Sequence, residues 1–240
     1  TERNYFILLD SSAIMHRVQK LLSNYGYCSR RKAEELIKEG KVKVNNKTIT
    51  IGDKASEDDR IYVDNKLINK EKKIYLIFNK PLHCVTALND MQHRTIMYYI
   101  KVKERVFPIG RLDYNTSGLL LLTNDGDFAN KIMHPRYEIK KTYMVEADKP
   151  IDEYSLRKIE QGILLEDGKT SPAKVNKIKD NIIEITIHEG KNKIIKRMME
   201  ELDYGVVSLE RIKVGNLGLE GLKPGKFRIL NEQEKEKIFR

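Results

Sequence analysis

After residue 73 the sequence contains six short apolar segments that are typical of β-strands. Only three helical patterns lie among them, near residues 126–133, 152–161 and 192–202. A parallel sheet needs a helix between nearly every pair of strands, so this order favours a mixed, mainly antiparallel sheet with flanking helices. The six segments are IYLIFNK (74–80), RVFPIG (105–110), GLLLLT (118–123), TYMVEA (142–147), IIEITIH (182–188) and VVSLERIKV (206–214).

The first part of the sequence has a different organisation. Residues 16–51 predict a helix, a second helix and a strand, with Ser29 as N-cap of the second helix and Gly40 at its end. The stretch RIYVDNKLI predicts another strand near residues 60–68. The 240 residues therefore predict an α+β protein with a helix–helix–strand domain ahead of the sheet domain. The expected boundaries are 1–14 for a leader that precedes Met15, 15–64, a charged linker at 65–73, and 74–240.

Positive charge gathers in this first domain. Between residues 16 and 51 there are nine Lys or Arg against three Glu, in a chain of formal net charge +10. The run SRRK at the start of the second helix opposes the helix dipole, so it does not serve helix stability, whereas a phosphate bound there would gain from the free N–H groups and the arginines. A solvated basic face is the alternative for any single lysine. The cluster predicts contact with RNA phosphates through Arg17, Lys20, Arg30, Arg31, Lys32, Lys41 and Lys43.

Composition excludes several other classes of protein. The two cysteines, Cys28 and Cys84, lie far apart without metal-ligand spacing, which argues against a zinc site or a disulfide framework and fits a reducing, cytoplasmic location. No apolar run is long enough to cross a membrane, and no glycine-rich phosphate-binding loop occurs. We therefore expect no metal, no cofactor and no membrane partner. The absence of a heptad pattern favours a monomer.

The stretch GRLDYNTSGLLLLTNDGD, residues 110–127, is the strongest candidate for a functional site. VFPIG and GLLLLT predict two buried strands, and RLDYNTS joins them through turn-forming residues. Asp113 thus lies on a loop held by rigid core on both sides, where functional residues are common. A cap or turn role for this aspartate is the alternative, and spacing alone leaves both open.

This stretch resembles the signature of the RsuA/RluB-type RNA pseudouridine synthases, G-R-L-D-x-x-T-S-G-L-L-L-L-T-N-D-G, at every specified position. Four further segments resemble blocks of the same family in the right order. They are FNKP (78–81), HPRYEIKKTY (134–143), LEDGKTSPAKV (165–175) and HEGKNKIIKRMME (188–200). Residues 16–62 are similar to the RNA-binding domain of ribosomal small-subunit protein four. The likeness spans residues 16 to about 230.

The resemblance implies a reaction in which the N1–C1′ bond of a uridine is broken, the base is turned and it is rejoined through C5. It implies Asp113 as the catalytic carboxylate, which either attacks the nucleoside or abstracts a proton beside the anomeric carbon. A buried carboxylate without a cation takes up a proton, and the family pattern gives Lys196 as that cation. By the same pattern Tyr143 stacks on the base, Ile195 forms an apolar wall and Arg111 fills the space that the flipped base leaves.

The sequence gives alternative roles for two residues. Arg197 is expected to contact either RNA or the protein, and Arg111 has a salt bridge to Asp125 or Asp127 as its alternative. A helix from about Asn192 would place Lys193, Lys196 and Arg197 on one side. The family usually has glutamine where this chain has Ile194.

The expected substrate is ribosomal RNA, as free RNA or as an assembly intermediate. The opening RVQKLLSNYGYCSRRKAEELIKEGKVKVN and the run KTSPAKV resemble the large-subunit RluB-like branch, which implies 23S rRNA. A small-subunit, 16S enzyme is the first alternative. A non-catalytic RNA-binding factor of ribosome assembly is the second.

Overall fold

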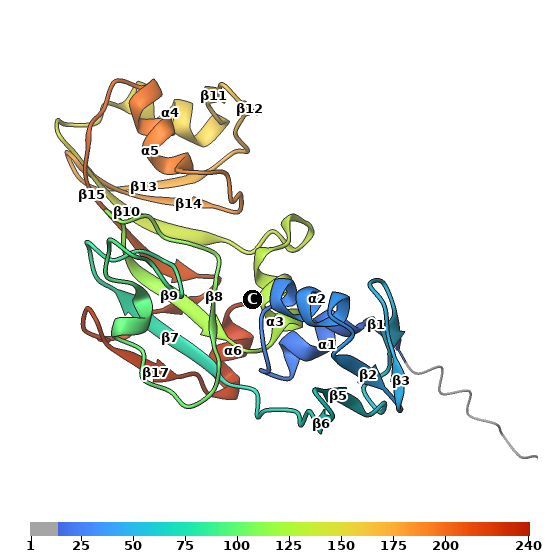
Figure 1. Ribbon diagram of the computed structural model, residues 1–240. Coiled ribbons are helices and arrows are strands. Elements are labelled where there is room, and N and C mark those ends of the chain that lie inside the picture. Colours follow the sequence, from blue (N-terminus) through green and yellow to red (C-terminus); the bar gives the residue numbers. More distant parts are fainter. Residues whose placement is uncertain (1–13) are drawn as a thin grey trace, which may run out of the picture. The chain divides into compact units, whose positions relative to one another are not determined.

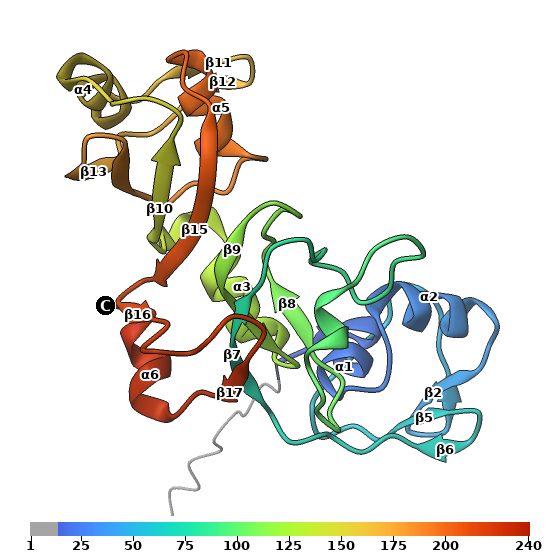
Figure 2. The same ribbon diagram turned by 90° about the vertical axis from the view of Figure 1, so that its left-hand side faces the viewer.

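The computed structural model describes residues 14–240, which fall into two compact units that divide between Lys72 and Lys73 (Figures 1 and 2). Apart from Ile14, the predicted leader lies outside the described residues. Among residues 14–240, no helix is both long and apolar enough to cross a bilayer.

The N-terminal unit packs two helices against a small sheet. Helix α1 (Val18–Asn24) and helix α2 (Arg30–Lys38) bury Leu21, Leu22 and Ala33 in one core with Val42 and Ile61. The Ser29 side chain accepts a hydrogen bond from the Lys32 backbone N–H at 3.2 Å, which confirms the predicted N-cap. The strands of the unit are β1 (His16–Arg17), β2 (Val42–Val44), β3 (Lys47–Thr48), β4 (Lys54–Ala55), β5 (Ile61–Val63) and β6 (Lys66–Leu67).

The single strand predicted at 60–68 is wrong. Residues Asp64 and Asn65 both have positive φ, 47° and 61°, and turn the chain between β5 and β6. Asp and Asn tolerate this left-handed backbone, so the DN pair makes a two-residue hairpin. The pair Asn45–Asn46, with φ of 48° and 69°, makes the same kind of turn between β2 and β3.

The C-terminal unit is built on one sheet of nine strands with helices on its faces (Figure 1). The sheet is mixed and mainly antiparallel, as predicted, and it contains more strands than the six predicted segments. The main path of the sheet runs β13-β14-β10-β15-β9-β7-β17, and β8 and β16 pair at its side. Its strands are β7 (Tyr75–Lys80), β8 (Phe107–Ile109), β9 (Ser117–Thr123), β10 (Lys141–Ala147), β13 (Lys174–Lys179), β14 (Ile182–Ile187), β15 (Val206–Val214), β16 (Leu217–Gly218) and β17 (Phe227–Ile229).

The helices and remaining short elements cover this sheet. The α-helices are α3 (Gly126–Met133), α4 (Glu153–Gln161), α5 (Ile194–Glu201) and α6 (Glu232–Lys237), with 3-10 turns at Ile96–Tyr98 and Pro135–Tyr137 and a hairpin of β11 (Leu164–Leu165) and β12 (Gly168–Lys169). Helices α4 and α5 contribute to one core with β10 and β14. A second part of the sheet, β7 to β9, has apolar cores on both faces.

The two parts of the sheet meet where β9 pairs with β15, which is the parallel pairing in this sheet. Gly118 of β9 lies opposite Arg211 of β15 with a φ of 104°. A Cβ at this position would overlap the Arg211 carbonyl oxygen, so glycine allows the two backbones to approach. Figure 2 shows β10 and β15 running on from this junction to the part of the sheet that carries α4 and α5.

A register shift in the pairing of β10 with β15 sets which side chains share a face. Thr142 pairs with Lys213, but the next residue, Tyr143, pairs with Arg211, so Ile212 is an extra residue. Such a bulge turns a side chain that regular alternation would place on the opposite face. Arg211 is therefore brought next to Tyr143.

Candidate active site

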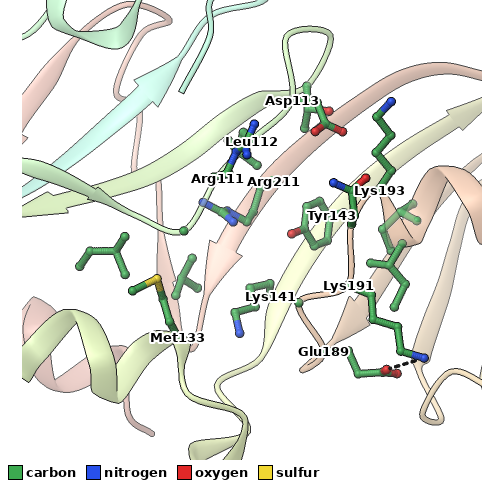
Figure 3. A pocket seen from close by; sticks show the side chains of 18 of the residues that line it. Arg111, Leu112, Asp113, Met133, Lys141, Tyr143, Glu189, Lys191, Lys193 and Arg211 are labelled. Atoms are coloured by element: carbon green, nitrogen blue, oxygen red, sulfur yellow. Dashed lines mark ion pairs between the residues drawn. The ribbon is translucent and has the colours of Figure 1, made fainter. Parts of the chain in front are cut away.

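A cavity of about 400 Å³ lies at the junction of β9, β10 and β15 (Figure 3). Its walls come from the loop between β8 and β9, from β10 and β15, and from residues 189–195. Four of the residues predicted for the site line it, namely Arg111, Asp113, Tyr143 and Ile195. The structure thus collects side chains that are up to 84 positions apart in the sequence, from 111 to 195.

The loop that carries Asp113 is held by its backbone. His83 N–H donates to the Tyr114 carbonyl at 2.9 Å, and the Thr86 hydroxyl donates to the Leu112 carbonyl at 2.7 Å. A turn closes the loop where Thr116 N–H donates to the Asp113 carbonyl at 3.1 Å. These contacts fix the loop while leaving the Asp113 carboxylate, whose side chain is 32% exposed, directed into the cavity.

Lys80 is the strongest anchor of this loop and was missed by the sequence analysis. Its side chain is fully buried, and its amine donates to the carbonyls of Pro81, Asp113 and Thr116 at 3.1, 3.0 and 2.8 Å. Burial lowers the pKa of Lys80 to about 8, which Asp113 partly opposes. The available signal was a lysine that ends an apolar strand, because such a residue is buried only when its donors are satisfied.

Lys196 approaches Asp113 from helix α5. Its amine lies 4.0 Å from the Asp113 carboxylate, and both side chains are about one-third exposed, at 28% and 32%. It lines a hollow beside the main cavity, together with His83, Asn115 and Ser117. The structure therefore places an ammonium next to the Asp113 carboxylate, as the sequence predicted.

The predicted helix boundary is wrong by two residues. Helix α5 begins at Ile194, and Lys193 precedes it in the left-handed conformation with φ of 48°. Lys193 is therefore exposed at the edge of the cavity and does not share a helical face with Lys196. Ile194 and Ile195 are both buried against the cavity.

Tyr143 lies in the middle of the cavity with a basic group on each of two sides. Figure 3 shows Asp113 on one side of the ring, Arg211 beside it and Lys141 on the side away from Asp113. Arg211 is 6% exposed, and its Nε donates to the Leu119 carbonyl at 2.7 Å. Burial, together with the charge of Arg211, lowers the pKa of Lys141 to about 8. Neither basic residue was predicted for the site from the sequence.

The remaining predicted residues lie at different places. Arg111 is exposed at the edge of the cavity and makes no ion pair with any of residues 14–240. Asp125, one of the two alternative partners predicted for Arg111, instead caps α3 and accepts a hydrogen bond from Tyr75 at 2.9 Å. Arg197 is not among the residues that line the cavity and forms a bidentate ion pair with Asp167, next to the β11–β12 hairpin.

The seven basic residues predicted to bind RNA lie in the N-terminal unit and differ in their surroundings. Arg17, Arg30, Arg31, Lys32 and Lys41 are exposed, whereas Lys20 and Lys43 are half-buried. Lys32 pairs with Glu35 at 2.9 Å, and Lys41 pairs with Glu39 at 2.7 Å. Among the described residues, no group of His, Cys, Asp and Glu is placed to hold a metal ion.

Comparison with known proteins agrees with this geometry. The RNA pseudouridylate synthase family matches residues 74–201, and the S4 domain family matches residues 16–61. Ribosomal large subunit pseudouridine synthase B of Bacillus subtilis is 45% identical over 93% of this chain and 96% of its own length. Dual-specificity RNA pseudouridine synthase RluF of Escherichia coli is 37% identical over 98% of this chain and 81% of its own length.

A solved structure extends the comparison to the fold. A crystal structure described as a pseudouridylate synthase aligns with a TM-score of 0.70 at 33% identity. The alignment covers 92% of this chain and 99% of the other.

Proposed function

Because this chain belongs to the RNA pseudouridylate synthase family and carries an S4 domain, we propose that it isomerises one uridine of large-subunit ribosomal RNA to pseudouridine. The observation that carries the proposal is the position of the Asp113 carboxylate. It lines a cavity together with Tyr143 and lies 4.0 Å from the Lys196 amine.

Asp113 is the catalytic carboxylate in this proposal. Its attack at C1′, or its abstraction of the neighbouring proton, requires the ionised form, and the Lys196 ammonium faces that carboxylate at 4.0 Å. The Lys80 amine fixes the Asp113 backbone, so the carboxylate needs little rearrangement before it reacts. The reaction exchanges an N1–C1′ bond for a C5–C1′ bond within one nucleotide, so reactant and product are isomers.

The target uridine must leave its base stack to enter the cavity. Extrusion costs a few kcal/mol, and a planar guanidinium can occupy the vacated space. Arg111 suits this task because it is exposed at the cavity edge and has no ion pair with a described residue. The ring of Tyr143 then supports the uracil by stacking, and Ile195 closes the apolar side.

Large-subunit rRNA is proposed as the substrate on two supports. The Bacillus subtilis relative, 45% identical over nearly its whole length, is named as a large-subunit enzyme. The basic residues of the N-terminal unit suit binding to the phosphates of a folded RNA.

The direct test replaces Asp113 with asparagine, which keeps the shape and removes the charge. We expect release of tritium from rRNA transcripts labelled at uridine C5 to fall below detection, while the Kd for the same RNA stays within about threefold of wild type. Retained tritium release would refute the role of Asp113.

The substrate is tested by mapping pseudouridine in rRNA from cells with and without the gene. One site missing from large-subunit rRNA is the expected result. A site missing from small-subunit rRNA instead would correct the proposed target, and an unchanged map would refute rRNA modification by this protein.

A further inference from the structure

The cavity contains more positive charge than its known contacts neutralise. Among the described residues, two carboxylates line it, Asp113 and Glu189. Asp113 faces Lys196, while Glu189 pairs with Lys191 at 3.5 Å and accepts a hydrogen bond from the Ser171 backbone N–H. Lys141 and Arg211 therefore share the cavity without a carboxylate partner of their own.

These two cations are built into the sheet. Lys141 and Tyr143 are two positions apart on β10, so their side chains project to the same face. The bulge at Ile212 brings Arg211 of β15 opposite Tyr143. The Lys141 amine donates to the His188 carbonyl at 3.3 Å, and Arg211 Nε donates to the Leu119 carbonyl, so both side chains are tethered by neutral groups.

Bringing the buried Arg211 and the half-buried Lys141 together is unfavourable unless an anion joins them. The lowered pKa of Lys141 expresses this cost, since burial and the charge of Arg211 are its two causes. The missing negative charge must therefore come from the molecule that enters the cavity.

The position of the pair distinguishes two sources of that charge. The phosphates of an extruded nucleotide remain joined to the RNA chain and so stay at the cavity edge, where Arg111 and Lys193 are exposed. The base enters furthest and lies against Tyr143. Arg211 is 6% exposed, and Lys141 lies on the side of Tyr143 away from Asp113 (Figure 3). Lys141 and Arg211 are therefore placed to contact the base and not the phosphates.

We propose that Lys141 and Arg211 form a subsite that takes up the negative charge of the uracil ring when its glycosidic bond breaks, an inference that rests on the proposed function. The electron pair of the N1–C1′ bond stays on N1 and spreads to O2 and O4, where the ammonium and guanidinium stabilise it. Meanwhile C1′ either forms an ester with Asp113 or forms a C1′=C2′ double bond as the C2′ proton passes to Asp113. The turned ring then forms the C5–C1′ bond with a ring electron pair, and this step breaks the ester or returns the proton to C2′. The C5 proton is lost, and N1 gains a proton, so the balance is an isomerisation.

The test compares Lys141→Gln with Lys140→Gln, a change at the exposed neighbouring lysine. Both act on rRNA transcripts labelled with tritium at uridine C5, with enzyme in excess over RNA, so that the rate of the bound complex is measured separately from Kd. We expect Lys141→Gln to slow the bound complex about 10²-fold, the usual effect of removing one charge-stabilising donor. Its Kd should stay within about twofold, because no phosphate contact is lost. Lys140→Gln should match wild type in both.

A second arm changes the leaving group. In transcripts that contain 5-fluorouridine, the fluorine itself stabilises the ring anion, so the defect of Lys141→Gln in rearrangement, measured by mass spectrometry of the digested nucleosides, should shrink to about tenfold. Lys141→Arg, which keeps the charge, should restore most of the rate on uridine. A defect of equal size with both nucleosides would refute charge stabilisation and indicate a structural role.

The other outcomes are distinct. A weakened Kd with an unchanged bound rate would overturn the proposal in favour of a phosphate contact. If the Lys141→Gln rate equals wild type, the subsite is refuted while the proposed function stands. If wild type itself releases no tritium from either rRNA, the proposed function fails, and this inference fails with it.

Discussion

The two units of the molecule use positive charge in opposite ways. In the N-terminal unit most of the candidate RNA-binding cations are exposed, and some are paired with nearby glutamates, as Lys32 is with Glu35. In the C-terminal unit, Lys80 and Arg211 are buried and contact backbone carbonyls. An exposed cation contributes to affinity that salt screens, whereas a buried one acts at short range in a low dielectric. Changes in the first unit should therefore alter binding, and changes in the second should alter chemistry or folding.

Among the variants that remove a positive charge, the largest effect is expected from Lys196→Met. Loss of the ammonium 4.0 Å from Asp113 removes a positive charge that faces the reacting carboxylate, so the rate of the bound complex at pH 7 should fall about 10³-fold. Tritium release with excess enzyme measures this rate. Arg197→Met is the matched control one residue away, because Arg197 pairs with Asp167; it should lower the melting temperature slightly and keep the bound rate. Equal losses in both variants would contradict the assignment.

Lys80→Met should affect both folding and chemistry. It leaves the carbonyls of Pro81, Asp113 and Thr116 without their shared donor, so the free energy of unfolding should fall by about 3 kcal/mol. The displaced loop should also slow the bound complex about 10²-fold. Urea unfolding and tritium release measure the two effects. A variant that unfolds like wild type would show that the loop does not depend on this amine.

The pH dependence of activity and of stability should show the effect of the two lysines whose pKa is lowered by burial, Lys80 and Lys141. Lys80 and Lys141 each have a pKa lowered to about 8 by burial, so activity at limiting RNA should fall above about pH 8 as they lose their protons. Between about 8 and the ordinary lysine pKa of 10.5, the unfolded chain binds more protons at these two sites, so their contribution to stability rises with pH.

Lys141→Arg provides the internal check on that profile. The charged groups that line the cavity around Lys141 are Arg211, Asp113 and Arg111, with Glu189, Lys191 and Lys193 from the segment after β14. With arginine at 141, the decline above pH 8 should become shallower, because the side chain at 141 then keeps its charge while Lys80 still loses its proton. An unchanged pH profile would exclude Lys141 as a source of the decline.

The smallest effect is expected in the N-terminal unit. Arg30→Gln with Arg31→Gln removes two exposed cations that have no ion pair among residues 14–240. The Kd for rRNA should rise several-fold, the slope of log Kd against log salt should decrease by about 1.5, and the bound rate should not change. Lys32→Gln should have less effect, because Glu35 already partners Lys32. A lower bound rate in the double variant would contradict the division of roles between the units.

Features of the structure that depend on neighbouring residues could be predicted from the sequence, whereas features that depend on distant residues could not. The strand IYLIFNK and the helix cap at Ser29 are local patterns, and the structure confirms both. The loop with Asp113 was also predictable, since turn residues between two apolar strands place it at their ends. The hairpin at Asp64–Asn65 was missed, although the DN pair is a known turn signal.

Other features depend on partners distant in the sequence. Lys80 can be buried because three carbonyls up to 36 residues away accept hydrogen bonds from its amine, and no local pattern encodes that arrangement. The place of Arg211 beside Tyr143 depends on the extra residue at Ile212, and a bulge has no period to detect. The separation of Lys193 from Lys196 depends on a left-handed residue before α5.

Gly118 has a consequence for the turnover rate of this protein. The strand that ends the Asp113 loop and the strand that carries Arg211 are in contact because no Cβ separates them there. A methyl group at 118 would push the strands apart and shift the carboxylate relative to the tyrosine ring, with every reacting side chain still in place. A substitution at Gly118 can thus abolish turnover although Gly118 is not one of the catalytic groups.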